Sequence, residues 1–357
     1  MADEYTKELE GLLDEVLKRD ATDLHISIGR PPVIRVDGSL IALDDNKVLD
    51  AEHAKNLALS LLSAEQQEKF WVEKDIDLSF TFNKKARFRV NVYQETGNVS
   101  AALRYIPTRI RSIEELNLPE TLHRFTQSAQ GFFLVVGPSG HGKSTALAAM
   151  VDEINHSRSD HILTIEDPIE YIFEQDKCII DQREVGSDVT DFHRGLRAMF
   201  REDADVCMIG EMRDPETIST AMTAAETGHL IFSTLHTNTA AQTIDRIIDS
   251  FPPHQQQQIR VQLSSTLLGI LSRRLIPAVK GGLINGFELL IANSAVRNLI
   301  REGKTHQIDM VIETNYEAGM VSLNRSLAAL AHEGLISMEN AELHATDAHE
   351  LRMLMQR

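Results

Sequence analysis

The sequence predicts an α/β protein in which a small α+β domain precedes a larger nucleotide-binding domain. Three observations support this fold class. The first part of the 357-residue chain contains strands of alternating polar and apolar residues, a phosphate-binding motif lies at 137–145, and short apolar strands then alternate with helices. Alternation of strands with helices is typical of a parallel sheet covered on both faces.

The first predicted domain covers residues 1–106. Spaced leucines predict a helix over 5–19, and DLHISIG and PVIRVDGSLI predict strands, with a turn signal at 37–38. A helical stretch follows at 51–70, where Ser63 is the expected N-cap of the second part. DIDLSFTF, ARFRVNVYQE and NVSAALRYI then predict an antiparallel meander.

The second predicted domain covers residues 119–357. It follows a linker at 107–118, which carries several charges and is bounded by Pro107 and Pro119. Its predicted strands are FFLVV, HILTI, KCII, DVCMIG and LIFSTL, separated by helical segments such as HRGLRAMFRE and PETISTAMTAAE. The chain beyond Pro252 is predicted to be mostly helical. The apolar residues assigned to one face of that helix are Ile259, Leu263, Leu267, Ile270 and Leu271.

The composition excludes several classes of protein. A net charge of −17 argues against a nucleic-acid binder, because clustered lysine and arginine normally hold phosphate backbones. The N-terminal MADEYTKELE has no apolar core of a signal sequence, and no stretch approaches about 18 uninterrupted apolar residues. We therefore expect a cytoplasmic protein without direct membrane insertion. Cys178 and Cys207 lie in apolar stretches and are expected to be buried free thiols.

The stretch GPSGHGKST fits the phosphate-binding pattern G-x-x-x-x-G-K-[ST] between a predicted strand and a predicted helix. Its glycines allow backbone N–H groups to point at phosphate oxygens, while Lys143 reaches the β- and γ-phosphates and Ser144 joins a Mg²⁺ shell. The sequence therefore predicts binding of ATP with Mg²⁺. The predicted nucleotide-binding residues are Gly137, Pro138, Ser139, Gly140, His141, Gly142, Lys143, Ser144 and Thr145.

Two acidic segments are candidates for the metal and for the catalytic water. DVCMIGE ends in Glu211, with Gly210 at the position where an aspartate is usual, so Glu211 is the predicted metal-site acid. TIEDPIEY brings Glu166, Asp167 and Glu170 close together, and crowded carboxylates favour a metal or water site. A plain acidic surface remains the alternative interpretation for both segments.

Two histidines delimit the predicted strand in GHLIFSTLHTN. His236, at its carboxyl end, is a candidate to sense the γ-phosphate, and His229 at the other end is a candidate for a subunit contact. Seven residues of strand separate them by about 23 Å, so they do not share one zinc site. Ordinary structural histidines remain the alternative.

The strand RFRVNVY places Arg87, Arg89 and Asn91 on one face and apolar residues on the other. Guanidinium groups on a rigid strand suit bidentate phosphate contact, whereas a solvated face is the ordinary alternative.

Together these motifs resemble those of the hexameric secretion and pilus-motor ATPases, a family related to type II secretion. The matching segments are GPSGHGKST, TIEDPIEY, GEMRDPET and ETGHLIFSTLHTN, in the family's order, with further likeness in ATDLHIS, ARFRVNVY and GMVSLNRSLAALAHEGLIS. AVRNLIREGK, at 295–304, is similar to an element of the type IV pilus retraction ATPases. By itself that segment is an amphipathic helix with Val296, Leu299 and Ile300 on one face.

The resemblance implies a PAS-like N-terminal domain, a RecA-like ATPase domain and a homohexamer. It also implies that Glu211 serves the metal and water and that Glu166 is the general base, although the sequence leaves these two roles interchangeable. The arginines implied to approach nucleotide from the small domain are Arg87, Arg89 and Arg104, and those implied as contacts from a neighbouring subunit are Arg201 and Arg213. His141 and Ser233 depart from the commoner small residues of the family.

The function implied is a motor that powers type IV pilus retraction and twitching motility. Its partners would be an inner-membrane platform protein and, indirectly, pilin, with the chain held at the inner face of the bacterial inner membrane. Three alternatives remain open: an assembly or type II secretion ATPase, an accessory retraction motor, and a nucleotide-gated interaction protein without turnover. The two separated cysteines cannot build the four-cysteine metal insertion frequent in the assembly and secretion members.

Overall fold

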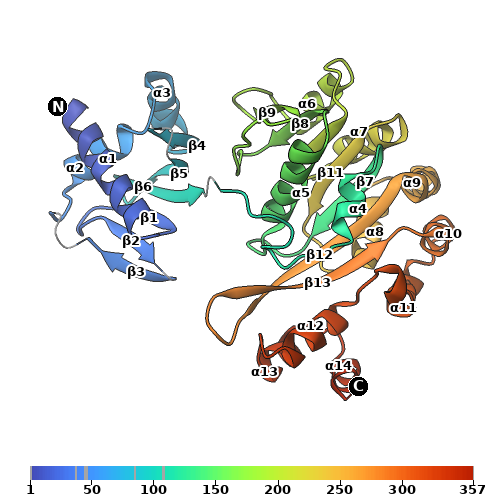
Figure 1. Cartoon of the computed structure of the whole chain (residues 1–357). Helices are drawn as coiled ribbons and strands as arrows, with labels where there is room; N and C mark the ends of the chain where they lie inside the picture. Colours follow the sequence, from blue (N-terminus) through green and yellow to red (C-terminus); the bar gives the residue numbers. More distant parts are fainter. Residues whose placement is uncertain (1, 37, 44–46, 84–85, 107–108, 357) are drawn as a thin grey trace. The chain divides into compact units, whose positions relative to one another are not determined.

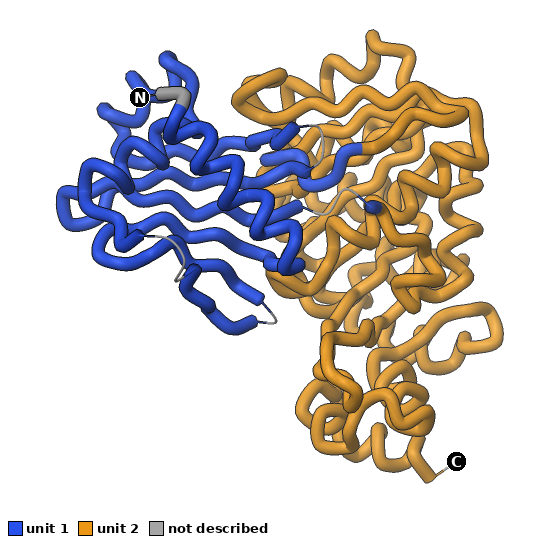
Figure 2. The backbone as a smooth tube through the Cα atoms, turned by 60° about the vertical axis from the view of Figure 1, so that its left-hand side comes forward, with its two compact units in different colours: residues 1–109, 168–172 blue, residues 110–167, 173–357 orange. Residues whose placement is uncertain are grey.

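The computed structural model describes residues 2–36, 38–43, 47–83, 86–106 and 109–356. Its contacts divide the chain into two units, coloured separately in Figure 2. Unit 1 comprises Met1–Arg109 with Pro168–Ile172, and unit 2 comprises Ile110–Asp167 with Phe173–Arg357. The predicted domain and linker boundaries stay a prediction. Part of the predicted linker, 107–108, lies outside the described residues.

Among its described residues, unit 1 contains a six-stranded antiparallel sheet in the order β3-β2-β1-β6-β5-β4, with three helices (Figure 1). This confirms the predicted α+β meander, and the turn expected at 37–38 falls partly outside the described residues. The elements are α1 (Ala2–Lys18), β1 (Asp23–Ile26), β2 (Val33–Val36), β3 (Ser39–Ala42), α2 (Ala51–Leu59), α3 (Ala64–Glu73), β4 (Asp75–Phe82), β5 (Ala86–Glu95) and β6 (Asn98–Ile106).

Local sequence signals explain these elements. Ser63 begins α3 through a capping box, in which its side chain accepts from the Gln66 N–H and the Gln66 side chain accepts from the Ser63 N–H. Phe88, Val90 and Val92 of β5 are all buried, because alternate residues of a strand face the helices that cover the sheet.

Unit 2 contains a seven-stranded sheet in the order β13-β12-β7-β11-β10-β8-β9, with every neighbouring pair parallel except β12 and β13. Every residue of β7, β10 and β11 is buried, as expected of parallel strands with both faces covered. The strands are β7 (Gly131–Val136), β8 (His161–Glu166), β9 (Ile179–Glu184), β10 (Val206–Ile209), β11 (Leu230–Leu235), β12 (Leu267–Pro277) and β13 (Leu283–Ile291).

The helices of unit 2 alternate with these strands and then continue alone to the C-terminus (Figure 1). They are α4 (Leu122–Thr126), α5 (Lys143–Ser157), α6 (Phe192–Met199), α7 (Pro215–Glu226), α8 (Ala240–Asp249), α9 (Pro253–Thr266), α10 (Ser294–Glu302), α11 (Ile308–Thr314), α12 (Leu323–His332), α13 (Met338–His344) and α14 (Ala348–Met355). Among the described residues, no helix is both long and apolar enough to cross a membrane.

One element of the prediction was wrong. The helix expected beyond Pro252 ends at Thr266, and the apolar residues Leu267, Ile270 and Leu271 belong to β12. They are buried because β12 pairs with β7 on one side and β13 on the other, inside the sheet. A strand buried on both faces has no period of two, so its apolar spacing also fits a helix.

The two cysteines are free and buried, as predicted. Complete burial raises the pKa of the Cys207 thiol, which favours the neutral, unreactive form.

Candidate functional site

Four segments of the predicted site meet at one edge of the unit 2 sheet. The strands β7, β11, β10 and β8 are parallel neighbours, and they end at Val136, Leu235, Ile209 and Glu166. The phosphate-binding loop, His236, Glu211 and Glu166 therefore lie at the carboxyl ends of adjacent strands. Such an edge is where open α/β sheets bind ligands.

The phosphate-binding loop, residues 137–142, turns between β7 and α5 on three glycines with positive φ. Gly137 has φ 143°, Gly140 φ 77° and Gly142 φ 73°, and Gly142 is the N-cap of α5. A Cβ added at Gly140 would meet no atom within 4 Å, whereas at Gly137 it would come within 2.6 Å of the Arg273 carbonyl oxygen. The loop is thus open on one side and packed against β12 on the other.

Lys143 joins the loop to the histidine segment. The residue is only 8% exposed, and its Nζ donates to the carbonyl oxygens of Gly137 and Pro138, each at 3.0 Å. The same Nζ lies 3.4 Å from Nδ1 of His236. Lys143 is therefore held at the mouth of the loop, as a phosphate-binding lysine requires.

Glu211 continues this chain of contacts. Its Oε2 lies 3.4 Å from Nε2 of His236, and its Oε1 pairs with the Arg213 guanidinium. That pairing raises the pKa of Arg213 above its ordinary value. His236 therefore connects the phosphate lysine to the predicted metal-site acid, while Arg213 contacts Glu211 within the same chain.

Glu166 is the more deeply buried of the two candidate acids, with 5% exposure. Thr164 Oγ1 donates to its Oε1 at 2.7 Å, and Gln182 Nε2 donates to the same oxygen at 3.4 Å. Two donors on one oxygen fix the direction of the carboxylate, which a water-orienting group needs. Asp167 is exposed, and Glu170 belongs to the segment that clusters with unit 1.

The remaining predicted residues lie elsewhere. His229 is at the amino end of β11, where Nδ1 lies 3.0 Å from the Ala224 carbonyl oxygen and its ring meets Phe200 edge-on. Within one chain it is therefore separated from the phosphate-binding loop by the length of a strand. Arg201 is exposed between α6 and β10, in the segment that leads to the amino end of β10, whereas the phosphate loop lies at the carboxyl ends of the strands.

The arginines of the small domain occupy one face of the unit 1 sheet. Arg89 on β5 pairs in register with Arg104 on β6, and both are exposed. Arg104 Nε donates to Asp23 Oδ1 at 2.9 Å, while Arg87 is half-buried. Their predicted approach to nucleotide stays a prediction.

Several residues that support the site gave no signal in the sequence. Thr164 and Gln182 orient Glu166, and Arg273 binds the phosphate loop from β12. Thr234 Oγ1 donates to the Gly210 carbonyl at 2.6 Å and so links β11 to the segment that carries Glu211.

Glu288 on β13 is a buried acid beside the histidine segment. Its Oε1 accepts from the Ala240 N–H at 2.7 Å, at the first turn of α8, which follows His236. Burial raises its pKa from 4.5 to about 7, while the Ala240 hydrogen bond opposes the shift. A raised pKa means that the stabilisation from this carboxyl is complete below pH 4.5 and is lost as the pH rises through about 7.

The variant Glu288→Gln is therefore expected to be more stable than the wild type at pH 8, by about 3 kcal/mol, because the neutral amide avoids burying a charge. The gain should vanish near pH 5. Thermal unfolding from pH 5 to 8.5 measures it, with the exposed Glu333→Gln as the matched control. If the difference in thermal stability between the wild type and Glu288→Gln does not change with pH, the raised pKa of Glu288 is contradicted.

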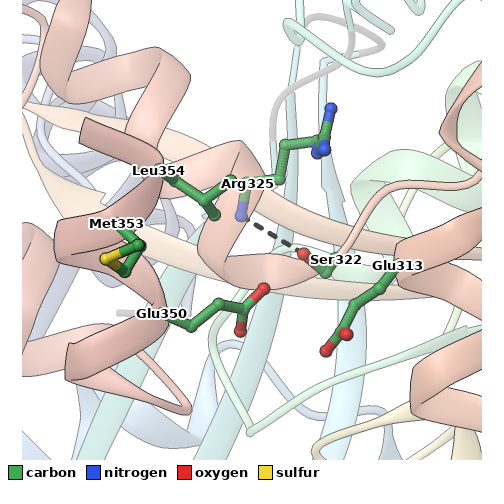
Figure 3. Close-up of a pocket in the computed structure, with 6 residues that line it drawn as sticks. All are labelled: Glu313, Ser322, Arg325, Glu350, Met353 and Leu354. Carbon is green, nitrogen blue, oxygen red and sulfur yellow. Dashed lines mark hydrogen bonds between the residues drawn. The ribbon is translucent and has the colours of Figure 1, made fainter. Parts of the chain in front are cut away.

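A pocket of about 210 Å³ lies apart from this edge, among α11, α12 and α14. In Figure 3 the carboxylates of Glu313 and Glu350 extend toward the same opening, while the Arg325 guanidinium points elsewhere. Arg325 lies over the Tyr316 ring, 4.1 Å from its centroid. The residues that line the pocket are Glu313, Ser322, Arg325, Glu350, Met353 and Leu354, and none belongs to the predicted nucleotide site.

The sheet edge fits a nucleotide with Mg²⁺. The open loop at Gly140 leaves room for phosphate, the amino end of α5 and Lys143 supply positive charge, and the hydroxyl of Ser144 and the carboxylate of Glu211 are oxygen ligands of the kind that Mg²⁺ prefers.

Comparison with known proteins agrees with this geometry. The family model described as type II/IV secretion system protein matches residues 3–340. A type IV pilus retractation ATPase of Pseudomonas aeruginosa, PilT, is 44% identical over 324 residues, which are 91% of this chain and 94% of the relative. A twitching motility protein of Neisseria gonorrhoeae is 42% identical over 321 residues, covering 90% and 86%.

A solved structure gives the same fold. The crystal structure of the pilus retraction motor PilT with bound ADP superposes with a TM-score of 0.91 at 44% identity, covering 96% of this chain and 98% of that one. The PAS-like and RecA-like fold class predicted from the sequence is thereby confirmed.

Proposed function

Because the chain belongs to the type II/IV secretion system protein family, we propose that it is an ATP-hydrolysing motor that powers type IV pilus retraction. The observation that carries the proposal is the convergence of the phosphate loop, His236, Glu211 and Glu166 at one sheet edge. The names of the relatives support the assignment to retraction over assembly or secretion.

Each residue of this edge has a proposed part in hydrolysis. Lys143 holds the β- and γ-phosphates, and Ser144 and Glu211 hold Mg²⁺, which when bound would neutralise charge on the phosphate oxygens. Glu166 orients the attacking water and accepts its proton. His236 contacts both Lys143 and Glu211 and is therefore placed to respond when either exchanges partners.

The assembly proposed for this motor is a homohexamer. It would act on an inner-membrane platform protein, and through it on pilin, at the inner face of the bacterial inner membrane. Arg87, Arg89 and Arg104 are proposed to approach the nucleotide from the small domain. His229, at the sheet edge opposite the phosphate loop, suits a contact with a neighbouring subunit better than chemistry in its own chain.

A deletion experiment in the source organism tests this function. Cells without the gene should carry excess surface pili and lose twitching, and wild-type protein should restore both properties while Lys143→Ala should not. Bald cells would instead identify an assembly motor. Unchanged pili and motility would overturn the proposal of a principal retraction motor and favour an accessory one.

The two acids should respond differently to removal of charge. Glu166→Gln is expected to lower kcat by a factor of about 10²–10⁴ at an unchanged Mg²⁺ requirement, because it removes a base. Glu211→Gln should raise the Mg²⁺ concentration needed for half-maximal turnover, because it removes a metal ligand. Steady-state assays over a Mg²⁺ titration separate the effects, with the exposed Glu216→Gln as control. The reverse pattern would exchange the two roles.

A further inference from the structure

The phosphate-binding loop is supported from behind by β12, and Arg273 makes the central contact. This arginine is only 2% exposed. Its Nη1 donates to the carbonyl oxygen of Gly142, and its Nε donates to Asn285 Oδ1 on β13 at 2.9 Å. The guanidinium therefore links the loop to the β12–β13 pair.

Gly142 is the position where such a contact has most influence. It is the N-cap of α5, with φ 73°, and its carbonyl oxygen also accepts the Ala146 N–H at 3.1 Å. The next residue is Lys143. A donor that fixes the Gly142 carbonyl consequently fixes the peptide from which the first turn of α5 and Lys143 depart.

His141 of the loop contacts the same strand. The Leu275 N–H donates to Nδ1 of His141 at 2.9 Å. A Cβ at Gly142 would lie 2.9 Å from Arg273 Nη1, so the guanidinium packs directly against the loop backbone. These contacts explain why His141 is accommodated where the family commonly has a smaller residue: its ring serves as an acceptor for β12.

Asn285 completes the arrangement. It is buried, its Oδ1 faces Arg273, and its Nδ2 has no hydrogen-bond partner among the described residues. Buried amides normally have partners for their N–H₂ groups, and this one has its hydrogen bond through Oδ1 to the guanidinium. Asn285 therefore fixes the orientation of Arg273 through a charge-assisted hydrogen bond.

We propose that Arg273 is a positioning residue for nucleotide binding, which holds the Gly142 carbonyl so that the loop and Lys143 are preorganised for phosphate. The inference rests on the proposed function of the loop as the ATP site. The Nε and Nη1 donors of Arg273 are directed to Asn285 and Gly142, so the arginine holds the loop backbone in this arrangement.

The test compares Arg273→Gln, Arg273→Lys and Asn285→Ala in the full chain, using titration with a fluorescent ADP analogue and Mg²⁺ together with ATPase kinetics. Arg273→Gln is expected to weaken ADP binding about tenfold and to raise KM in proportion, since it removes a charge-assisted hydrogen bond. Arg273→Lys should restore part of the affinity. Asn285→Ala should change affinity in the same direction by a smaller factor, and it carries the test if Arg273→Gln does not fold.

Arg158→Gln is the matched control. Arg158 also donates to backbone carbonyl oxygens, those of Thr126 and Ser128, but it follows the opposite end of α5 from the phosphate loop. Its loss should lower thermal stability and leave ADP affinity unchanged. If Arg273→Gln and Asn285→Ala lower stability alone, with affinity equal to the wild type, the positioning role is wrong. If the wild type itself binds no nucleotide, it is the proposed function that fails.

Discussion

Alanine in place of Lys143 is expected to lower ATP turnover by a factor on the order of 10³, because a preorganised charge aimed at the transferred phosphoryl group is lost. The reason is geometric. Nζ is held by two loop carbonyls beside His236. Lys143 is the one lysine of the segment GPSGHGKST. Phosphate release from purified protein at saturating Mg²⁺ measures the effect.

The control for this variant is Lys177→Ala, which removes an exposed lysine of the same unit and should leave turnover unchanged. Circular dichroism of both variants should match the wild type, because the contacts of the Lys143 side chain are with the loop carbonyls and His236 rather than with the backbone of a helix or strand. Full turnover by Lys143→Ala would refute the assignment of the loop as the catalytic site.

Loss of Arg297 is expected to destabilise unit 2 by about 3 kcal/mol, through lost hydrogen bonds to a charged group and unpaired backbone carbonyls. Arg297 donates to four carbonyl oxygens, and two of them belong to the last turn of α9, where carbonyls lack a partner within the helix. The acceptors are Ser264 at 2.7 Å, Ser265 at 2.6 Å, Leu267 at 2.9 Å and Ala292 at 2.9 Å. Denaturant unfolding of Arg297→Ala measures the change.

Arg301→Ala is the informative partner of this variant. Arg301 is exposed on α10, where its Nη2 donates to Asn298 Oδ1 of the same helix, so its loss should change stability by less than about 0.5 kcal/mol. If AVRNLIREGK is a motor element, Arg301→Ala should reduce motility with ATPase activity and stability preserved. Intact motility of Arg301→Ala cells would indicate that this helix has only a structural role. If Arg297→Ala has the same unfolding free energy as the wild type, the proposed capping of α9 by Arg297 is contradicted.

Most of the candidate site could be predicted because each of its parts combines a local signal with the end of an apolar strand. GPSGHGKST, Glu166, Glu211 and His236 all follow short buried runs, and parallel strands bring their carboxyl ends together. The order of the strands and the contact of His236 with both Lys143 and Glu211 depend on pairing across the sheet. No local pattern contains that information.

The sequence failed where tertiary contacts decide. Residues 267–277 have an apolar spacing that fits a helix, and their pairing with β7 made them a strand. Arg273 and Glu288 were missed for a related reason, because their partners Gly142 and Ala240 are far away in the chain. Arg297 was recognised only as part of a motif, since the carbonyl groups of Ser264 and Leu267 that accept from it lie 33 and 30 residues earlier in the chain.

The antiparallel direction of β13 places α10 and the phosphate loop at opposite edges of the unit 2 sheet. Because β13 runs antiparallel to β12, with Ile291 opposite Gly269, the chain leaves the sheet for α10 at the edge where the parallel strands begin. The phosphate loop lies at the edge where they end. The proposed site of ATP hydrolysis and α10 therefore lie at opposite ends of the parallel strands, about 20 Å apart over six residues of strand. Substitutions on the exposed side of α10 are consequently expected to reduce motility while ATP turnover is preserved.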